Sequence, residues 1–136
     1  MATYFSRMPP TRRNPDGVHS PIGAYSHQVE VSTQARMLAI AGQVGRTLDG
    51  RVPEDPIEQL ELALENIRLN LEAAGMEVGD IVKLNWYVVG QMDMARRREV
   101  LVRWLGGHEP ASTFVYVAAL AAPEYKVEIE AWACRE

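Results

Sequence analysis

The sequence contains almost no cysteine, no long apolar run and no excess of positive charge, and each shortage excludes a class of protein. Its single cysteine, Cys134, cannot form a disulfide within the chain, which excludes small secreted domains built around several disulfides. No stretch approaches the roughly 18 consecutive apolar residues of a membrane-spanning helix. The formal net charge of −4 argues against a protein that holds nucleic acid through bulk positive charge.

Short motifs for metal, nucleotide or nucleophilic chemistry are missing as well. His19, His27 and His108 lie far apart and lack the i, i+4 spacing of ligands on a helix, so we expect no metal site. The glycines form neither a GxxxxGK nor a GxGxxG loop for phosphates. Cys134 lies near the end of the chain and outside any recognisable nucleophile motif, so we favour a packing role over a nucleophilic one.

The composition is that of one ordinary globular domain. Of the 136 residues, 47% are hydrophobic and 24% are charged, as in ordinary globular proteins. The chain is long enough to bury a hydrophobic core. Residues 1–17 are expected to form an arm, because their prolines would break the amphipathic helix of a targeting peptide. A transit peptide is the alternative for this arm. The default expectation is a cytoplasmic protein whose domain spans residues 18–136.

Apolar periodicity and turn residues predict five strands and two helices. Asp55, Pro56 and Gly75 mark the clearest helix, with a carboxylate cap, a proline at the first helical position and a glycine stop. Asp93 can cap a second helix, which a glycine pair ends. The expected helices cover residues 56–74 and 94–105, and the expected strands cover residues 28–31, 37–43, 80–89, 112–120 and 126–134. The apolar side of each helix comprises Leu60, Leu64, Ile67, Leu71 and Ala74 in the first and Met94, Leu101 and Leu105 in the second.

The order β-β-α-β-α-β-β predicts an α+β fold, one mixed sheet with two helices packed on one face. Side chains alternate along a strand, so each strand divides into two sets. We expect the helices to cover Val127, Ile129, Ala131 and Ala133 of the last strand and Thr113, Val115 and Val117 of the strand before it. The other, uncovered face would carry Glu128, Glu130, Trp132 and Cys134 together with Ser112, Phe114 and Tyr116. A face that mixes aromatic and acidic side chains in this way indicates a subunit interface.

Glu128 and Glu130 are the most suggestive pair of carboxylates. They stand two apart on one strand, so both side chains leave the same face. Two carboxylates in a cleft can raise one another's pKa and make one of them a usable general acid or base. The alternative is a structural salt bridge across the subunit interface.

Several segments taken together resemble the RidA/YjgF family, also called the L-PSP endoribonuclease or translation-inhibitor family. They are PIGAYSHQV (residues 21–29), AIAGQV (39–44), LENIRLNLEAAGMEVGDIVK (64–83), and VYVAAL followed by KVEIEAWA. The resemblance implies a chorismate-mutase-like fold and a homotrimer whose sheets line a central barrel, with three clefts between subunits. It also implies hydrolysis of small enamines and imines to 2-keto acids and ammonia, without a metal or organic cofactor.

Three residues match positions that the family uses in its cleft. Tyr25 matches the tyrosine of IGxY, Gly42 matches a glycine beside the site, and Glu128 matches the glutamate of EIEA that orients water. The resemblance therefore implies that Glu128 and Tyr25 are catalytic and that Gly42 borders the substrate.

Other positions depart from the family pattern. Ser112 stands where the family has the arginine that binds the substrate carboxylate, and Ala41 stands where it has a serine. Phe114 replaces a frequent cysteine, and Arg98 replaces a frequent asparagine. Serine cannot supply the charge of arginine, so the substrate is expected to differ. Either Arg98 binds the anion from the second helix, or the cleft takes a neutral or aromatic ligand framed by Tyr25, Phe114 and Tyr116, whose alternative role is interface packing.

Three functions follow from these residues. The first is a hydrolase of small enamines, imines or related metabolites, similar to 2-iminobutanoate/2-iminopropanoate deaminase but with altered specificity. The second is a non-catalytic trimer that binds a small metabolite. The third is an RNA-directed role, which the net charge disfavours although Arg96, Arg97 and Arg98 could form a basic patch. No membrane partner is expected.

Overall fold

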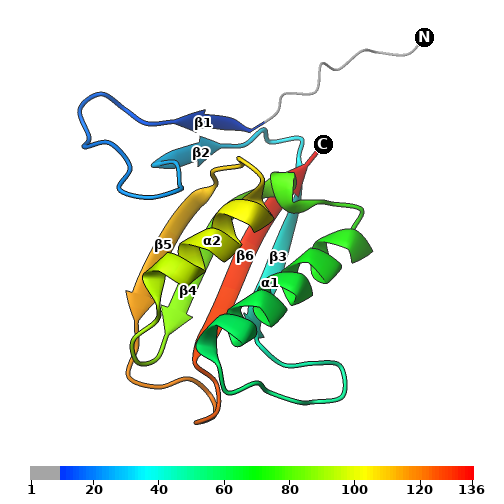
Figure 1. The fold of residues 1–136 in the computed structure, drawn as a ribbon. Coiled ribbons are helices and arrows are strands. Elements are labelled where there is room, and N and C mark those ends of the chain that lie inside the picture. The colour runs from blue at the N-terminus through cyan, green and yellow to red at the C-terminus, as the bar shows by residue number, and fades with distance from the viewer. Residues whose placement is uncertain (1–9) are drawn as a thin grey trace.

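The structure, a computed structural model, describes residues 10–136 (Figure 1). The strands are β1 (Thr11–Arg13), β2 (Gln28–Glu30), β3 (Arg36–Val44), β4 (Ile81–Val88), β5 (Ala111–Tyr116) and β6 (Val127–Arg135). The helices are α1 (Pro56–Ala73) and α2 (Met94–Leu105), and a short 3-10 turn, η1 (Val78–Asp80), precedes β4. All seven expected elements are present, but β5 ends at Tyr116 and not at residue 120 as predicted, and β1 is an addition that the sequence did not predict.

Four strands form one mixed sheet in the order β3-β6-β4-β5. β6 runs antiparallel to both β3 and β4, whereas β4 and β5 are parallel. α1 lies over β3 and β6, and α2 lies over β4 and β5 on the same face (Figure 1). The α+β prediction is therefore confirmed. The expected arm contributes β1, which pairs with β2 as a separate small antiparallel sheet.

The helix boundaries follow the capping residues that the sequence contains. The Asp55 side chain accepts a hydrogen bond from the backbone N–H of Ile57 at 2.9 Å, and Pro56 occupies the first helical position of α1. Asp93 caps α2 in the same way through the N–H of Arg96 at 3.1 Å. Gly106 ends α2 in the left-handed conformation that favours glycine (φ 58°).

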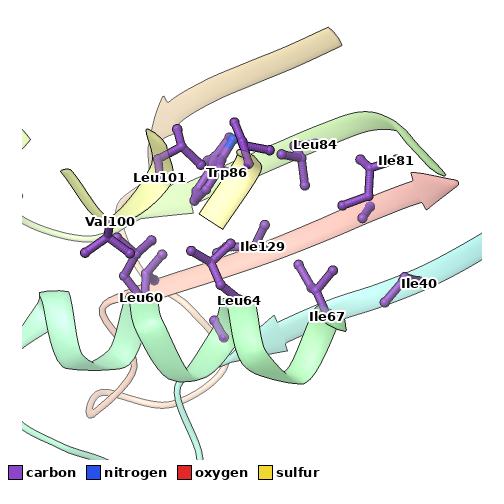
Figure 2. Close-up of a cluster of buried hydrophobic side chains, with 14 of the residues drawn as sticks. Ile40, Leu60, Leu64, Ile67, Ile81, Leu84, Trp86, Val100, Leu101 and Ile129 are labelled. Atoms are coloured by element: carbon purple, nitrogen blue, oxygen red, sulfur yellow. The ribbon is translucent and has the colours of Figure 1, made fainter. Parts of the chain in front are cut away.

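The core fills the space between the helices and the sheet (Figure 2). Leu60, Leu64 and Ile67 of α1 point toward the sheet, and each is at most 1% exposed. The predicted inner set of β6 is confirmed, since Val127, Ile129, Ala131 and Ala133 are all buried. One polar side chain, Gln59, lies fully inside and is satisfied by three backbone hydrogen bonds, to the carbonyls of Pro53 and Glu124 and from the N–H of Lys126.

The two faces of β5 are reversed relative to the prediction. The Trp86 indole N–H of β4, buried under the helices, donates to the Ser112 hydroxyl, so Ser112 and Phe114 lie on the helical side. Thr113 lies on the open face, where its hydroxyl accepts a hydrogen bond from the Lys83 ammonium at 2.7 Å. The prediction is wrong because both sets of this strand are largely apolar, so alternation alone does not decide which set is buried.

The open face of the sheet remains partly apolar. Trp132, Met37 and Val115 are 43%, 55% and 39% exposed, and they surround polar groups of β4 and β6. Cys134 at the end of this face is buried, and burial raises the pKa of its thiol. Among residues 10–136, no helix has the length and apolar character needed to cross a membrane.

Candidate functional site

Glu128 is half-buried on the open face of β6, between Val44 of β3 and Tyr87 of β4. The pairing of β3 with β6 is irregular between Ile40 and Gln43, and Gly42 lies in this interruption. A Cβ on Gly42 would come within 2.7 Å of Cδ of Glu128. The glycine therefore makes room for the carboxylate, and the two residues that the resemblance places in the cleft are in direct contact.

Glu128 and Glu130 have different surroundings. One carboxylate oxygen of Glu130 accepts hydrogen bonds from Tyr87 at 2.6 Å and from the Asn85 amide at 3.1 Å. The first of these hydrogen bonds raises the pKa of Tyr87. The Glu128 carboxylate makes no hydrogen bond or ion pair with any residue in the described range 10–136. Glu130 is thus held in place by its neighbours, whereas the Glu128 carboxylate is free to bind water or a ligand.

A second feature is a pocket of about 360 Å³ on the helical side, at the edge of the sheet. The loop 22–25 forms one wall, Met94, Arg97 and Leu101 of α2 form another, and Ser112 and Phe114 of β5 form the base. The loop is tied to the start of β5, because the buried Ser26 hydroxyl donates to the Glu109 carbonyl at 2.6 Å. The Tyr25 hydroxyl accepts a hydrogen bond from Ile22 N–H at 3.3 Å, which folds the tyrosine over its own loop.

Arg97 brings a positive charge into this pocket. Its guanidinium carbon lies 4.4 Å from the centre of the Trp86 ring and 4.6 Å from that of Phe114. Such stacking stabilises a cation that is partly removed from water. Burial lowers the pKa of Arg97 to about 10, so the group stays charged at neutral pH. Its Nε is buried without a hydrogen-bond partner, and Arg97 forms no ion pair within the part of the chain that the structure describes.

The base of the pocket is polar at only one point. The Ser112 hydroxyl accepts the Trp86 indole N–H at 2.9 Å, so its oxygen is already engaged with the core. Phe114 stands edge to face with Tyr116, at 5.2 Å between ring centres. Tyr116 itself is 55% exposed, and its hydroxyl contacts the Met94 sulfur of α2.

The structure brings some of the expected site residues together and separates others. Tyr25, Ser112 and Phe114 line the pocket, and Gly42 and Glu128 meet on the open face. Within one chain the two groups are apart, because β4 lies between β5 and β6 and their side chains leave opposite faces of the sheet. Ala41 is exposed next to Gly42. Arg98 is exposed on α2 and does not line the pocket.

Sequence reasoning considered Arg98 and missed Arg97. The signal was present, because Arg97 fits the apolar side of α2 at spacings of three from Met94 and four to Leu101. A residue on that side of the helix faces the sheet and not the solvent, whatever its charge.

Among residues 10–136, no group of three or more His, Cys, Asp or Glu side chains could hold a metal ion.

Comparison with known proteins gives a consistent result. The family described as Endoribonuclease L-PSP matches residues 17–135. A 2-iminobutanoate/2-iminopropanoate deaminase of Escherichia coli (strain K12) is 35% identical over 118 residues, which cover 84% of this chain and 89% of the relative. A RutC family protein of Pyrococcus horikoshii is 35% identical over 120 residues, 85% of this chain and 90% of the relative.

Solved structures agree with these sequence matches. A Rid family protein of unknown function from Yersinia pestis superposes with a TM-score of 0.82 at 33% identity, covering 94% of this chain and all (100%) of the other. The structure of Escherichia coli TdcF with bound serine superposes with a TM-score of 0.69 at 33% identity, covering 85% of this chain and 91% of the other.

Proposed function

Because this chain belongs to the Endoribonuclease L-PSP family, which includes the RidA/YjgF proteins, we propose that it hydrolyses small enamines or imines in a cleft completed by a second copy of the chain. The observation that carries the proposal is the contact between Gly42 and Glu128, which leaves an unpaired carboxylate on an exposed face of the sheet. A relative that shares this fold is named as a deaminase of 2-iminobutanoate and 2-iminopropanoate.

In the proposed reaction, Glu128 orients a water molecule toward the imine carbon and accepts a proton from it. The oxygen adds to the carbon, the C=N bond becomes a C–N single bond, and the nitrogen takes up a proton. Collapse of this intermediate breaks the C–N bond and releases ammonia and a 2-keto acid. The overall change adds one water and removes one ammonia, so it needs no oxidant or reductant.

The proposed cleft lies between copies. Glu128 and the pocket with Tyr25 occupy opposite faces of the sheet, so one chain does not offer both to one substrate. The pocket lies at the β5 edge, and Glu128 lies toward the β3 edge. Placing the β3 side of one chain against the β5 edge of the next joins the two halves, and repetition of such a head-to-tail contact closes a ring. The exposed Trp132 and Met37 supply apolar area for this contact. A homotrimer is the ring that we propose.

The test uses imines made in the cuvette from several amino acids by an amino-acid oxidase or a dehydratase. The wild-type protein should accelerate imine decay, and Glu128→Gln should abolish the acceleration without changing the fold. Glu58→Gln, an exposed carboxylate at the start of α1, is the matched control and should behave like the wild type. Equal decay rates with wild-type protein and Glu128→Gln for every imine would exclude this catalysis.

A second candidate is a trimer that binds a metabolite without turning it over. The observation that favours it is Ser112. This serine occupies the position at which the family resemblance leads us to expect an arginine, and its hydroxyl accepts a hydrogen bond from the Trp86 indole N–H. Saturable thermal stabilisation by a ligand without product formation would support this function over hydrolysis. The RNA-directed alternative has less support, because Arg96 pairs with Asp55 at 3.0 Å and Arg97 lies in the pocket, so the three arginines form no common patch.

A further inference from the structure

The Arg97 guanidinium is a charge without a counter-charge. Its central carbon lies 4.4 Å from the centre of the Trp86 ring and 4.6 Å from that of Phe114, and its Nε is buried without a hydrogen-bond partner in the described residues. The other arginines that pair on this side of the molecule do so with carboxylates at the surface, as Arg96 does with Asp55. Removing a guanidinium from water without a partner is unfavourable, and proteins usually pair such a group.

No carboxylate of the same helix is placed to neutralise Arg97. Asp93 is the cap of α2 and accepts from the backbone N–H of Arg96. Glu99 is exposed. Among residues 10–136, the neighbouring group with an electrostatic effect on Arg97 is the Tyr116 hydroxyl, and no carboxylate forms an ion pair with Arg97. We therefore look for the anionic partner of the Arg97 guanidinium in a bound ligand and not in the described residues of this chain.

The pocket shows what kind of partner fits. Arg97 and Ser112 both line it, so the guanidinium enters from the helix wall the same space that an arginine at position 112 would enter from the strand. The N–H groups of a guanidinium lie in its plane, so a guanidinium that contacts rings through a face can present its two terminal nitrogens to a planar anion such as a carboxylate. The lining around Arg97 is largely apolar, with Met94 and Leu101 on the same helix and Phe114 at the base of the pocket.

We propose that Arg97 is the carboxylate anchor of this pocket, in place of the strand arginine that Ser112 has replaced, and that the substrates are imino acids with an apolar side chain. The inference rests on the proposed function for the identity of the reacting group, but the anion site itself does not depend on turnover. Arg97 binds the carboxylate, and the apolar walls receive the side chain.

The experiment measures binding of 4-methyl-2-oxopentanoate, a carboxylate with an apolar side chain, and of its uncharged amide, by calorimetry or ligand-detected NMR. Arg97→Met keeps the stem of the side chain over the two rings and removes the charge. It should weaken carboxylate binding by about ten- to a hundredfold and leave binding of the amide unchanged. Arg97→Lys keeps a charge without the planar edge and should lose part of the affinity. This second variant also tests the inference if Arg97→Met does not fold.

Two further variants on the same helix identify which arginine acts. Arg98→Met addresses the residue first considered from the sequence, and Arg103→Met is the exposed control. Both should bind the carboxylate as the wild type does. Equal carboxylate affinity in the wild type and Arg97→Met, or a loss that follows Arg98 instead, would overturn the inference.

The outcomes for the anchor and for the reaction are separable. Carboxylate binding that depends on Arg97 in a protein without turnover supports the anchor and contradicts the hydrolase. Turnover that requires Glu128 but is indifferent to Arg97→Met supports the hydrolase and contradicts the anchor.

Discussion

Gly42 lies so close to Glu128 that the smallest side chain at position 42 would displace the carboxylate. We therefore expect Gly42→Ala to fold normally and to lose activity, because Glu128 would swing away from the water that it orients. A displacement of about 1 Å at a reacting group can cost roughly a hundredfold in rate. Imine decay assays and circular dichroism measure the two effects. Gly79→Ala is the control, since a Cβ there would meet no atom within 4 Å and Gly79 lies outside the pocket. Full activity in Gly42→Ala would contradict a role for the position of Glu128.

The hydrogen bond from Tyr87 to Glu130 makes a prediction about pH. It raises the pKa of Tyr87 above the ordinary value of 10.0, so the hydrogen bond stabilises the folded protein below that pH and is lost as the pH rises through the folded-state pKa. Unfolding by urea at pH 8 should show Tyr87→Phe to be less stable than the wild type, and the difference should shrink above pH 10. Tyr125→Phe, whose hydroxyl accepts from Arg46 instead, is the comparison. A difference that grows above pH 10 would contradict this assignment.

The elements that the sequence predicts are those with local signals. The caps Asp55 and Asp93 and the stop at Gly106 lie in the chain next to the helices that they delimit, so a short window contains the whole signal. β1 is different: its residues, 11–13, carry no apolar pattern and become a strand only through pairing with β2. No local window contains that partner.

The site was predictable in part for the same reason. Strand alternation singled out Glu128 together with Glu130, whereas Gly42 was found only through the resemblance. The contact between Gly42 and Glu128 depends on an irregularity in the pairing of β3 with β6 that the sequence does not mark. The faces of β5 were reversed because Val115 and Phe114 are equally suited to burial. Arg97 was missed because the sequence analysis considered it only as part of a basic patch of three arginines, although its spacing from Leu101 places it on the inner side of α2.

The Asp55 cap makes a prediction in the acid range. The hydrogen bond from Ile57 N–H, and next the pairing with Arg96, lower the pKa of Asp55 below its ordinary value of 3.8. A carboxylate with a lowered pKa stabilises the fold above its unfolded-state pKa, and this contribution is lost as the pH falls through the folded-state value. Asp55→Asn keeps a capping oxygen and removes the charge. It should be less stable than the wild type at pH 6 and equally stable once the pH falls below the folded-state value. Urea titrations at several pH values measure this, and a difference that persists at the lowest pH would show that the charge is not its source.

Gln59 makes a prediction about the core. Its amide satisfies two backbone carbonyls and one backbone N–H, and its backbone lies against Gly45, the residue that follows β3. Gln59→Leu preserves volume but leaves these three backbone groups without their partner. Each buried unsatisfied group costs about 1–3 kcal/mol, so for three groups we expect a loss of at least about 3 kcal/mol in the free energy of unfolding. Asn70→Leu, an exposed amide on the same helix, should change stability little. A neutral effect of Gln59→Leu would mean that water replaces the amide.

Subunit mixing tests whether each site draws on two copies. We expect Glu128→Gln and Tyr25→Ala to be inactive when each is prepared alone. If Glu128 of one copy faces the pocket of the next, a trimer assembled from both variants contains some sites in which both residues are intact. At equal mixing, half of the glutamates and half of the tyrosines are native, so about one quarter of the sites should be active.

Unfolding the two proteins together and refolding them should therefore recover about a quarter of the wild-type rate, whereas mixing without unfolding should recover little. A site confined to one chain predicts no recovery in either case.

The interface itself is tested by Trp132→Arg, which should give monomers in analytical ultracentrifugation and abolish turnover, because it places an unpaired charge on the open face. Leu69→Arg, at a similarly exposed position on α1 (48% against 43%), should leave both assembly and turnover intact. Turnover by a monomeric Trp132→Arg protein would show that one chain is enough for catalysis. Glu128 and Tyr25 of the same chain would then have to come together by a rearrangement of the sheet edge.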